Sequence, residues 1–147
     1  MNQQHLSLHS IIDFALARPA HSVAVRRSGA HKGIRLANHN MNITRLTNLA
    51  RTKARHKAHK HAVMVTRGGA IVSFGTNHDE VHAEVAALKQ LWPSERRGTK
   101  IVSIRLRRSG TLGMAKPCPE CQEFMRQNGV KSVMYTNRQG DWETMRL

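Results

Sequence analysis

Two short motifs in this sequence carry side chains that could bind a metal and move protons. They are His82-Ala83-Glu84 and Pro117-Cys118-Pro119-Glu120-Cys121, and the second contains both cysteines of the chain. Each motif follows a turn and opens an expected amphipathic helix, whose N-terminus favours the deprotonated form of a thiol. Two thiolates and one imidazole fill three corners of a zinc tetrahedron and leave the fourth to water. We therefore expect His82, Cys118 and Cys121 to hold a catalytic zinc ion, with Glu84 placed to transfer protons without binding the metal.

The two motifs together resemble the signature of the zinc-dependent cytidine and deoxycytidylate deaminase superfamily, in which His-x-Glu precedes Pro-Cys-x-x-Cys. The resemblance covers roughly residues 42–147 and does not reach the N-terminal part. It implies hydrolytic deamination of a cytosine-type base with release of ammonia, because Zn²⁺ lowers the pKa of its bound water to about 7. Glu84 would take the proton from this water and deliver protons to the departing amine. The resemblance further implies that Asn77 contacts the sugar or base and that the backbone at Ala83 reads the base.

The identity of the first ligand bears on the substrate. This chain has His82 where the resembling free-cytidine enzymes usually have cysteine, and histidine occurs there in deoxycytidylate deaminases and in nucleic-acid editing deaminases. The departure argues against free cytidine among three candidates, which are cytidine, a deoxycytidine nucleotide and cytosine in single-stranded nucleic acid. A flipped base in a strand would need a stacking platform, and none is evident among the few aromatic residues. Phe74 and Tyr135 are expected in the core.

Other functions are consistent with parts of the pattern. A Cys-x-x-Cys pair before a helix also fits a redox site, but a redox site leaves His82 and Glu84 unexplained. A structural zinc site would need a fourth ligand such as His56, His59 or His61, which the sequence places on the polar face of a helix. A further alternative is a non-enzymatic basic protein with a deaminase fold that binds nucleic acid or serves as an assembly component. Glu84 argues against it, because a scaffold needs no general base.

The charge of the chain is strongly positive. It has 147 residues with 24 Lys and Arg against 9 Asp and Glu, and residues 1–62 contain 11 basic and 1 acidic side chains. A solvated surface would explain a modest excess, but this one predicts a phosphate-bearing partner, either a nucleotide or single-stranded nucleic acid. The expected phosphate contacts are Arg26, Arg27, Lys32, Arg35, Arg51, Arg55 and Lys60.

Composition limits the class of protein. A chain that is 39% hydrophobic can form a real core, and its two cysteines make no disulfide framework, which favours a reducing compartment. The apolar runs are too short to span a bilayer, and the N-terminus lacks the pattern of a signal peptide. We expect a cytoplasmic protein with no membrane partner that assembles as a homo-oligomer.

The elements that must position the two motifs follow from the hydrophobic pattern. We expect a three-layer α/β/α cytidine-deaminase-like fold, with a mixed sheet of about five strands and helices on both faces. The last strand returns by a hairpin, which resembles the cytidine-deaminase-type branch of the superfamily. Residues 1–40 form an expected basic extension, and residues 41–147 form the catalytic domain. The extension should contain a helix at residues 8–17 and a possible hairpin of strands 22–26 and 34–37. The domain should contain helices at 42–60, 82–92 and 118–128, and strands at 61–66, 70–75, 100–106, 131–136 and 142–147.

Overall fold

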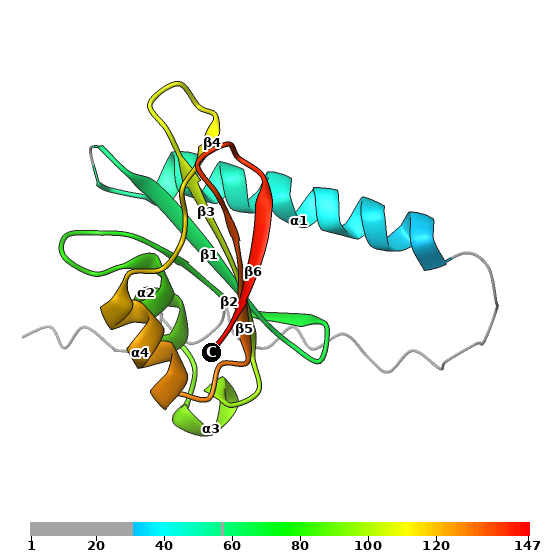
Figure 1. Ribbon diagram of the computed structural model, residues 1–147, viewed down its shortest axis with the longest axis vertical. Helices are drawn as coiled ribbons and strands as arrows, with labels where there is room; N and C mark the ends of the chain where they lie inside the picture. The colour runs from blue at the N-terminus through cyan, green and yellow to red at the C-terminus, as the bar shows by residue number, and fades with distance from the viewer. Residues whose placement is uncertain (1–30, 57) are drawn as a thin grey trace, which may run out of the picture.

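The computed structural model describes residues 31–56 and 58–147, with side chains from residue 42 onward. Its centre is a mixed sheet with strand order β2-β1-β3-β5-β6, and a short strand β4 pairs with β3 (Figure 1). The strands are β1 Lys60–Arg67, β2 Ala70–Thr76, β3 Lys100–Leu106, β4 Leu112–Gly113, β5 Ser132–Thr136 and β6 Trp142–Arg146. The helices are α1 His31–Lys53, α2 Ala83–Lys89, α3 Pro93–Arg96 and α4 Pro119–Gln127.

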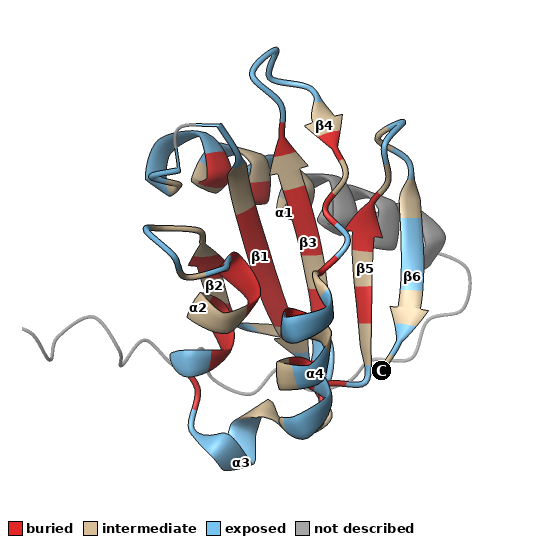
Figure 2. Ribbon diagram, turned by 60° about the vertical axis from the view of Figure 1, so that its left-hand side comes forward, coloured by how far each residue is buried: buried red, intermediate tan, exposed pale blue. Residues whose placement is uncertain are grey.

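Helices cover both faces of the sheet, so the expected three-layer architecture is confirmed. Helix α1 lies across one face, while α2 and α4 lie on the other (Figure 2). The central strand β1 shows why, because alternate side chains of a strand point to opposite faces. Val63 and Val65 pack with residues of α2 and α4, whereas Ala62 and Met64 pack with residues of α1. Burial on both faces is typical of a central strand in an α/β sheet.

The strand pairing follows the expected connections. Strands β1 and β2 form an antiparallel hairpin, β3 and β5 run parallel on either side of the α4 crossover, and β5 and β6 form a second antiparallel hairpin. The first hairpin turns at Gly68 and Gly69, whose φ angles of 58° and 86° suit glycine. The pairing therefore places the start of β1 beside the ends of β2 and β3, at the edge of the sheet from which the chain leads to α2.

The N-terminal helix differs from the expected one. Asn42 lies inside α1 rather than at its start, and α1 ends at Lys53 rather than near Lys60. Residues 34–37, expected as a strand, lie in this helix. Side-chain bonds explain the early end, because His56 Nδ1 accepts hydrogen bonds from the backbone N–H groups of Ala58 and His59 at 3.3 and 3.1 Å. Such local bonds offer the backbone an alternative to the helix.

Other expectations for the N-terminal region remain predictions. The helix expected at residues 8–17 and the strand expected at residues 22–26 lie outside the described residues. The boundary between residues 40 and 41 also remains a prediction, and α1 runs continuously across it.

The helix that begins after His82 is shorter than expected. Helix α2 ends at Lys89, and α3 begins separately at Pro93 instead of the one helix expected to reach Trp92. The last turn of α2 closes with short-range bonds from Gln90 N to Ala87 O and from Leu91 N to Leu88 O. Proline at the first position of α3 fits a new helix start. Across the described residues, no helix is both long and apolar enough to cross a membrane.

Candidate active site

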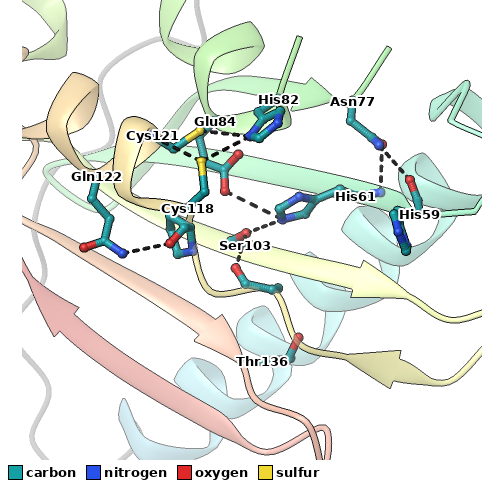
Figure 3. A network of polar contacts seen from close by, with 12 residues as sticks. His59, His61, Asn77, His82, Glu84, Ser103, Cys118, Cys121, Gln122 and Thr136 are labelled. Atoms are coloured by element: carbon teal, nitrogen blue, oxygen red, sulfur yellow. Dashed lines mark hydrogen bonds and ion pairs between the residues drawn. The ribbon is translucent and has the colours of Figure 1, made fainter. Parts of the chain in front are cut away.

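The structure brings His82, Cys118 and Cys121 together from two helix N-termini. His82 precedes α2, and Cys118 caps α4 with Pro119 at the first helical position. The Nδ1 atom of His82 lies 3.4 Å from Cys118 Sγ and 3.2 Å from Cys121 Sγ (Figure 3). All three atoms lie within 4.8 Å of one another. Because each cap residue is held by its helix, the packing of α2 beside α4 sets the geometry of the cluster.

The donor set fits zinc. Tetrahedral zinc places a nitrogen ligand and a sulfur ligand about 3.5 Å apart, close to the two His82–cysteine distances of 3.4 and 3.2 Å. Burial raises the pKa of the Cys121 thiol, and the nearby Glu84 carboxylate raises it further. A thiolate in this place therefore requires a neighbouring cation, which zinc provides. Within the described residues, these three side chains are the group whose ligand atoms lie close enough together to hold a metal ion.

Glu84 is buried in the first turn of α2, directly beside the metal-binding side chains. It is 1% exposed, and its Oε1 lies 3.8 Å from His61 Nε2. The other oxygen, Oε2, is buried and makes no hydrogen bond within the described part of the chain. Desolvation of a carboxylate is costly unless its oxygens are bonded. An acid in such a place is therefore a candidate proton carrier rather than a structural group.

His61 lies beside Glu84 and is hydrogen-bonded to Ser103 in the sheet. Ser103 donates its hydroxyl to the carbonyl of Ala115 at 3.1 Å, so its oxygen accepts the proton of His61 Nε2 at 2.6 Å (Figure 3). The ring of His61 therefore carries its proton on Nε2. Burial lowers the pKa of His61, although the Glu84 carboxylate opposes this effect. The ring is thus neutral and fixed in direction beside Glu84.

Asn77 follows β2 and lies at the rim of the site. Its Oδ1 accepts the backbone N–H of His61 at 2.9 Å, and its Nδ2 donates to the carbonyl of His59 at 2.6 Å. The side chain therefore ties the loop after β2 to the start of β1 (Figure 3). Contact with a sugar or base would use the second lone pair and the second N–H of the amide. This role of Asn77, like the reading of the base by the buried Ala83 backbone, remains a prediction.

A cavity of about 470 Å³ opens over Glu84, His82 and Cys118. Its walls include Asn77, His61 and Met114 together with two cationic side chains, Arg105 and Lys116. The Arg105 guanidinium contacts His59 Nδ1, while its Nε is buried and makes no hydrogen bond in the described chain. The cavity is large enough for a nucleobase, and its lining carries both charges, because Asp79 and Glu80 also belong to it.

The cationic residues named from the sequence fall in different places. Arg51 is exposed near the end of α1, Arg55 is exposed just after it, and Lys60 begins β1. Lys32 and Arg35 belong to the first part of α1, where side chains are not described, and Arg26 and Arg27 lie outside the described residues. Placing His56, His59 and His61 on one helix was wrong, because the helix ends before them and His61 lies in β1.

Several residues of the cavity were not found by sequence analysis. Ser103 and Arg105 looked like ordinary strand residues, and Lys116 like a surface cation. In the alternating pattern of β3, both Ser103 and Arg105 occupy the face that the apolar Ile101 also uses, and a polar pair on a core face is the signal that could have revealed them. His61 carried the same signal at the start of an apolar strand.

Comparisons with known proteins agree with this geometry. Residues 37–137 match the family model described as "Cytidine and deoxycytidylate deaminase zinc-binding region". The chain belongs to this family. A search of curated proteins found no match. The family match to a zinc-binding region agrees with the three side chains that the structure brings together as a possible zinc site.

Solved structures with the same fold include two kinds of deaminase. The apo dCMP deaminase from cyanophage S-TIM5 has a TM-score of 0.52 at 20% identity, over 69% of this chain and 84% of that chain. RibD of Acinetobacter baumannii has a TM-score of 0.50 at 17% identity, over 70% of this chain and 29% of that chain. The deaminase/reductase from Thermotoga maritima has a TM-score of 0.50 at 19% identity, over 68% of this chain and 30% of that chain. This chain therefore spans less than a third of the length of the last two, and the likeness establishes the fold.

Proposed function

We propose that this protein hydrolyses the amino group of a cytosine-type base in a nucleotide or in single-stranded nucleic acid, giving the uracil form and ammonia. The observation that carries this proposal is the Glu84 carboxylate, 1% exposed beside the three metal-binding side chains, with one oxygen that no described group bonds. Its position fits a group that exchanges protons with a substrate.

The metal-binding residues have a defined part in this proposal. His82, Cys118 and Cys121 would hold zinc, which supplies a water of lowered pKa as the nucleophile at neutral pH. Glu84 accepts a proton at its carboxylate and delivers protons to the ring nitrogen and then to the departing amine. His61 lies beside Glu84, 3.8 Å from its Oε1, and its own ring is fixed by Ser103 at 2.6 Å.

The alternatives derived from the sequence are less well supported by the geometry. A redox pair would need the two thiols to react with each other, yet both lie against His82 Nδ1 at 3.4 and 3.2 Å, as ligands of one ion do. A non-enzymatic scaffold would gain nothing from a buried carboxylate with an unbonded oxygen, which costs stability. A deaminase uses both features.

An ammonia-release screen tests the proposal. The full chain loaded with zinc is offered cytidine, deoxycytidylate, adenine and guanine nucleotides, and single-stranded DNA and RNA. Glu84→Gln should remove nearly all turnover, by about 10²-fold or more, since general acid–base catalysis contributes that much. It should keep the zinc, which is measured by metal analysis. Glu123→Gln, which alters an exposed carboxylate on α4 that pairs with Arg126, is the matched control and should retain activity. A wild type that releases no ammonia from any of these substrates would overturn the proposal.

A further inference from the structure

Two histidine rings stack on each other at the mouth of the cavity. His56 and His59 stack with ring centroids 5.2 Å apart and planes 9° from parallel. His56 Nδ1 accepts backbone N–H bonds, and His59 Nδ1 faces the Arg105 guanidinium, which can only donate. Both rings therefore carry a proton on Nε2. Partial loss of solvent around the ring and the positive charge of Arg105 also lower the pKa of His59. The two rings are held parallel to each other, and both side chains are exposed, so the outer face of the stack is open to a base.

The position of this pair relates it to the active site. His56 and His59 line the same cavity as Glu84 and His82. The His59 backbone is held by the Nδ2 donor of Asn77 at 2.6 Å (Figure 3). Flat rings on which a base can stack are what single-strand binders use. The histidine pair thus provides a stacking surface in a chain whose phenylalanine and tyrosine side chains are few.

A hollow lined by cations lies next to the pair. It measures about 330 Å³, and its lining includes Arg51, Lys60, Arg107 and Arg108 but no acidic residue. Lys60 pairs with Leu106 across β1 and β3, while the next pair, His61 and Arg105, points to the opposite face, into the active-site cavity. Ala58, which lines the hollow, lies in sequence between His56 and His59, which line the cavity. The hollow and the cavity therefore adjoin around one end of the sheet.

We propose that this end of the sheet binds single-stranded nucleic acid alongside the target base. A base next to the target stacks on the His56–His59 pair, and the phosphates that follow enter the hollow. The proposal rests on the proposed function in one respect, which is that the target base occupies the active-site cavity. A mononucleotide carries its phosphate close to its own base and could engage one or two cations at the cavity edge. Four cations lie around the end of the sheet, beyond the stacked rings. A ligand that contacts both the rings and these cations must extend over several consecutive nucleotides.

The test measures binding rather than turnover. Fluorescence anisotropy of labelled single strands of about 12 nucleotides, within the site size of single-strand binders, is recorded over a series of salt concentrations. DNA and RNA strands are compared, and polyglutamate serves as a polyanion without bases. The protein is the full zinc-loaded chain with Glu84→Gln, so that no substrate is consumed. Each phosphate contact with a single strand contributes about 0.7 to the slope of log affinity against log salt.

Two charge variants separate a local contact from general attraction. Arg107→Gln with Arg108→Gln should make the slope shallower by about 1.4. Lys131→Gln with Arg146→Gln removes the same charge from a second basic hollow, which also contains Lys100 at the opposite end of β3. This control should leave the slope unchanged. Equal changes in the two variants would show general attraction and overturn the proposal, as would polyglutamate binding as tightly as the nucleic acid strands.

The histidine pair is tested separately. His59→Ala should weaken binding by roughly 5- to 150-fold, the range seen when one stacked base is lost, with little change in slope. His59→Phe keeps a flat ring and should restore most of the affinity. Failure of His59→Phe to bind better than His59→Ala would overturn the stacking role. Thermal unfolding of each variant confirms that it is folded.

Failure of this inference can be told apart from failure of the proposed function. If a free deoxycytidine nucleotide is deaminated and no strand binds even at low salt, the strand-binding inference is wrong and the deaminase proposal stands. If strands bind through the hollow and no substrate releases ammonia, the binding inference stands and the deaminase proposal is wrong.

Discussion

At the scale of single residues, the site depends on a polar chain that leads from Glu84 into the sheet. The carboxylate lies beside His61, whose Nε2 proton is bonded to Ser103 and whose backbone N–H is bonded to Asn77. Ser103 is in turn bonded to the carbonyl of Ala115, which is fixed in the loop before the cysteines. The Nε2 proton of His61 and the hydroxyl proton of Ser103 each point in one defined direction. The residues beside Glu84 are therefore fixed themselves, and no group in the described chain bonds its second oxygen.

Removal of the Ser103 hydroxyl tests this chain. Ser103→Ala should lower the free energy of unfolding by about 1–3 kcal/mol, since it leaves the buried His61 N–H and the Ala115 carbonyl unpaired. It should also lower the kcat of deamination, because His61 is free to turn beside Glu84. Ser73→Ala is the matched control, since its buried hydroxyl donates to the Ala87 carbonyl at 2.9 Å outside the cavity. Ser73→Ala should lower the free energy of unfolding measured in urea and leave kcat unchanged. Equal losses of kcat in both variants would show that the effect is general.

The lowered pKa of His61 predicts a pH effect on stability. Burial holds this pKa below the ordinary value of 6.5, so just below pH 6.5 the unfolded chain binds more protons than the folded chain. The free energy of unfolding should therefore fall as the pH drops below about 6.5. This loss of stability reaches its full size once the pH is below the folded-state pKa. His61→Gln should make this pH dependence shallower in denaturant titrations. A variant with the same pH dependence as wild type would contradict the assignment.

At the scale of elements, the site depends on how closely α2 approaches β2. Gly75 permits this approach, because a Cβ built there would lie 2.3 Å from the Ala83 carbonyl oxygen and 2.5 Å from the Ala87 nitrogen. Both neighbours are backbone atoms of the helix that carries Glu84. The glycine therefore sets the distance between the sheet and α2.

A methyl group at this position should push the helix away. Gly75→Ala is expected to lower the free energy of unfolding by about 2 kcal/mol or more, at the upper part of the range for overpacking. It should also weaken zinc binding, because His82 moves with α2 while the cysteines stay with α4. Val72→Ala in the same strand is the control, since Val72 is exposed, and should change either measurement little. Chemical denaturation and competition with a zinc chelator give the two values.

At the scale of the whole molecule, the metal joins parts of the chain that are far apart in sequence. His82 and Cys121 are separated by 39 residues, and their helices, α2 and α4, pack side by side on one face of the sheet. The sheet extends from β2 to β6, and α1 covers its other face. Zinc therefore acts as a link between α2 and α4 that the unfolded chain lacks.

Removal of zinc should destabilise the fold. A ligand bound only by the folded state at about 1,000 times its Kd contributes about 4 kcal/mol. For a chain of this size we expect the Tm to fall by roughly 10 °C in a strong chelator. His82→Ala should show the low Tm without chelator, and added chelator should then change it little. Purified wild type should carry about one zinc per chain, since the three ligands form one site. A wild-type Tm that does not respond to chelator would contradict the structural role.

The sequence alone determined the features that depend on local chemistry and on pattern. The spacing within His82-Ala83-Glu84 and within Cys118 to Cys121 indicated a metal site, because helix starts place these side chains within one turn of each other. Strand periodicity and connection lengths predicted the mixed sheet and its two hairpins, because short turns force antiparallel pairs and helical crossovers force parallel ones.

The tertiary structure decided what depends on contacts between distant segments. Helix α1 ends at Lys53 because His56 bonds its own loop and because Asn77, 16 residues after His61, holds the following segment against β2. The helix propensity of residues 54–60 does not indicate that contact, because hydrogen bonds in the tertiary structure override the small free-energy differences in helix propensity. The roles of His61, Ser103 and Arg105 also became visible only when β1 and β3 were paired. A side chain gains such a role from the residue opposite it in the sheet, and that partner lies far along the chain.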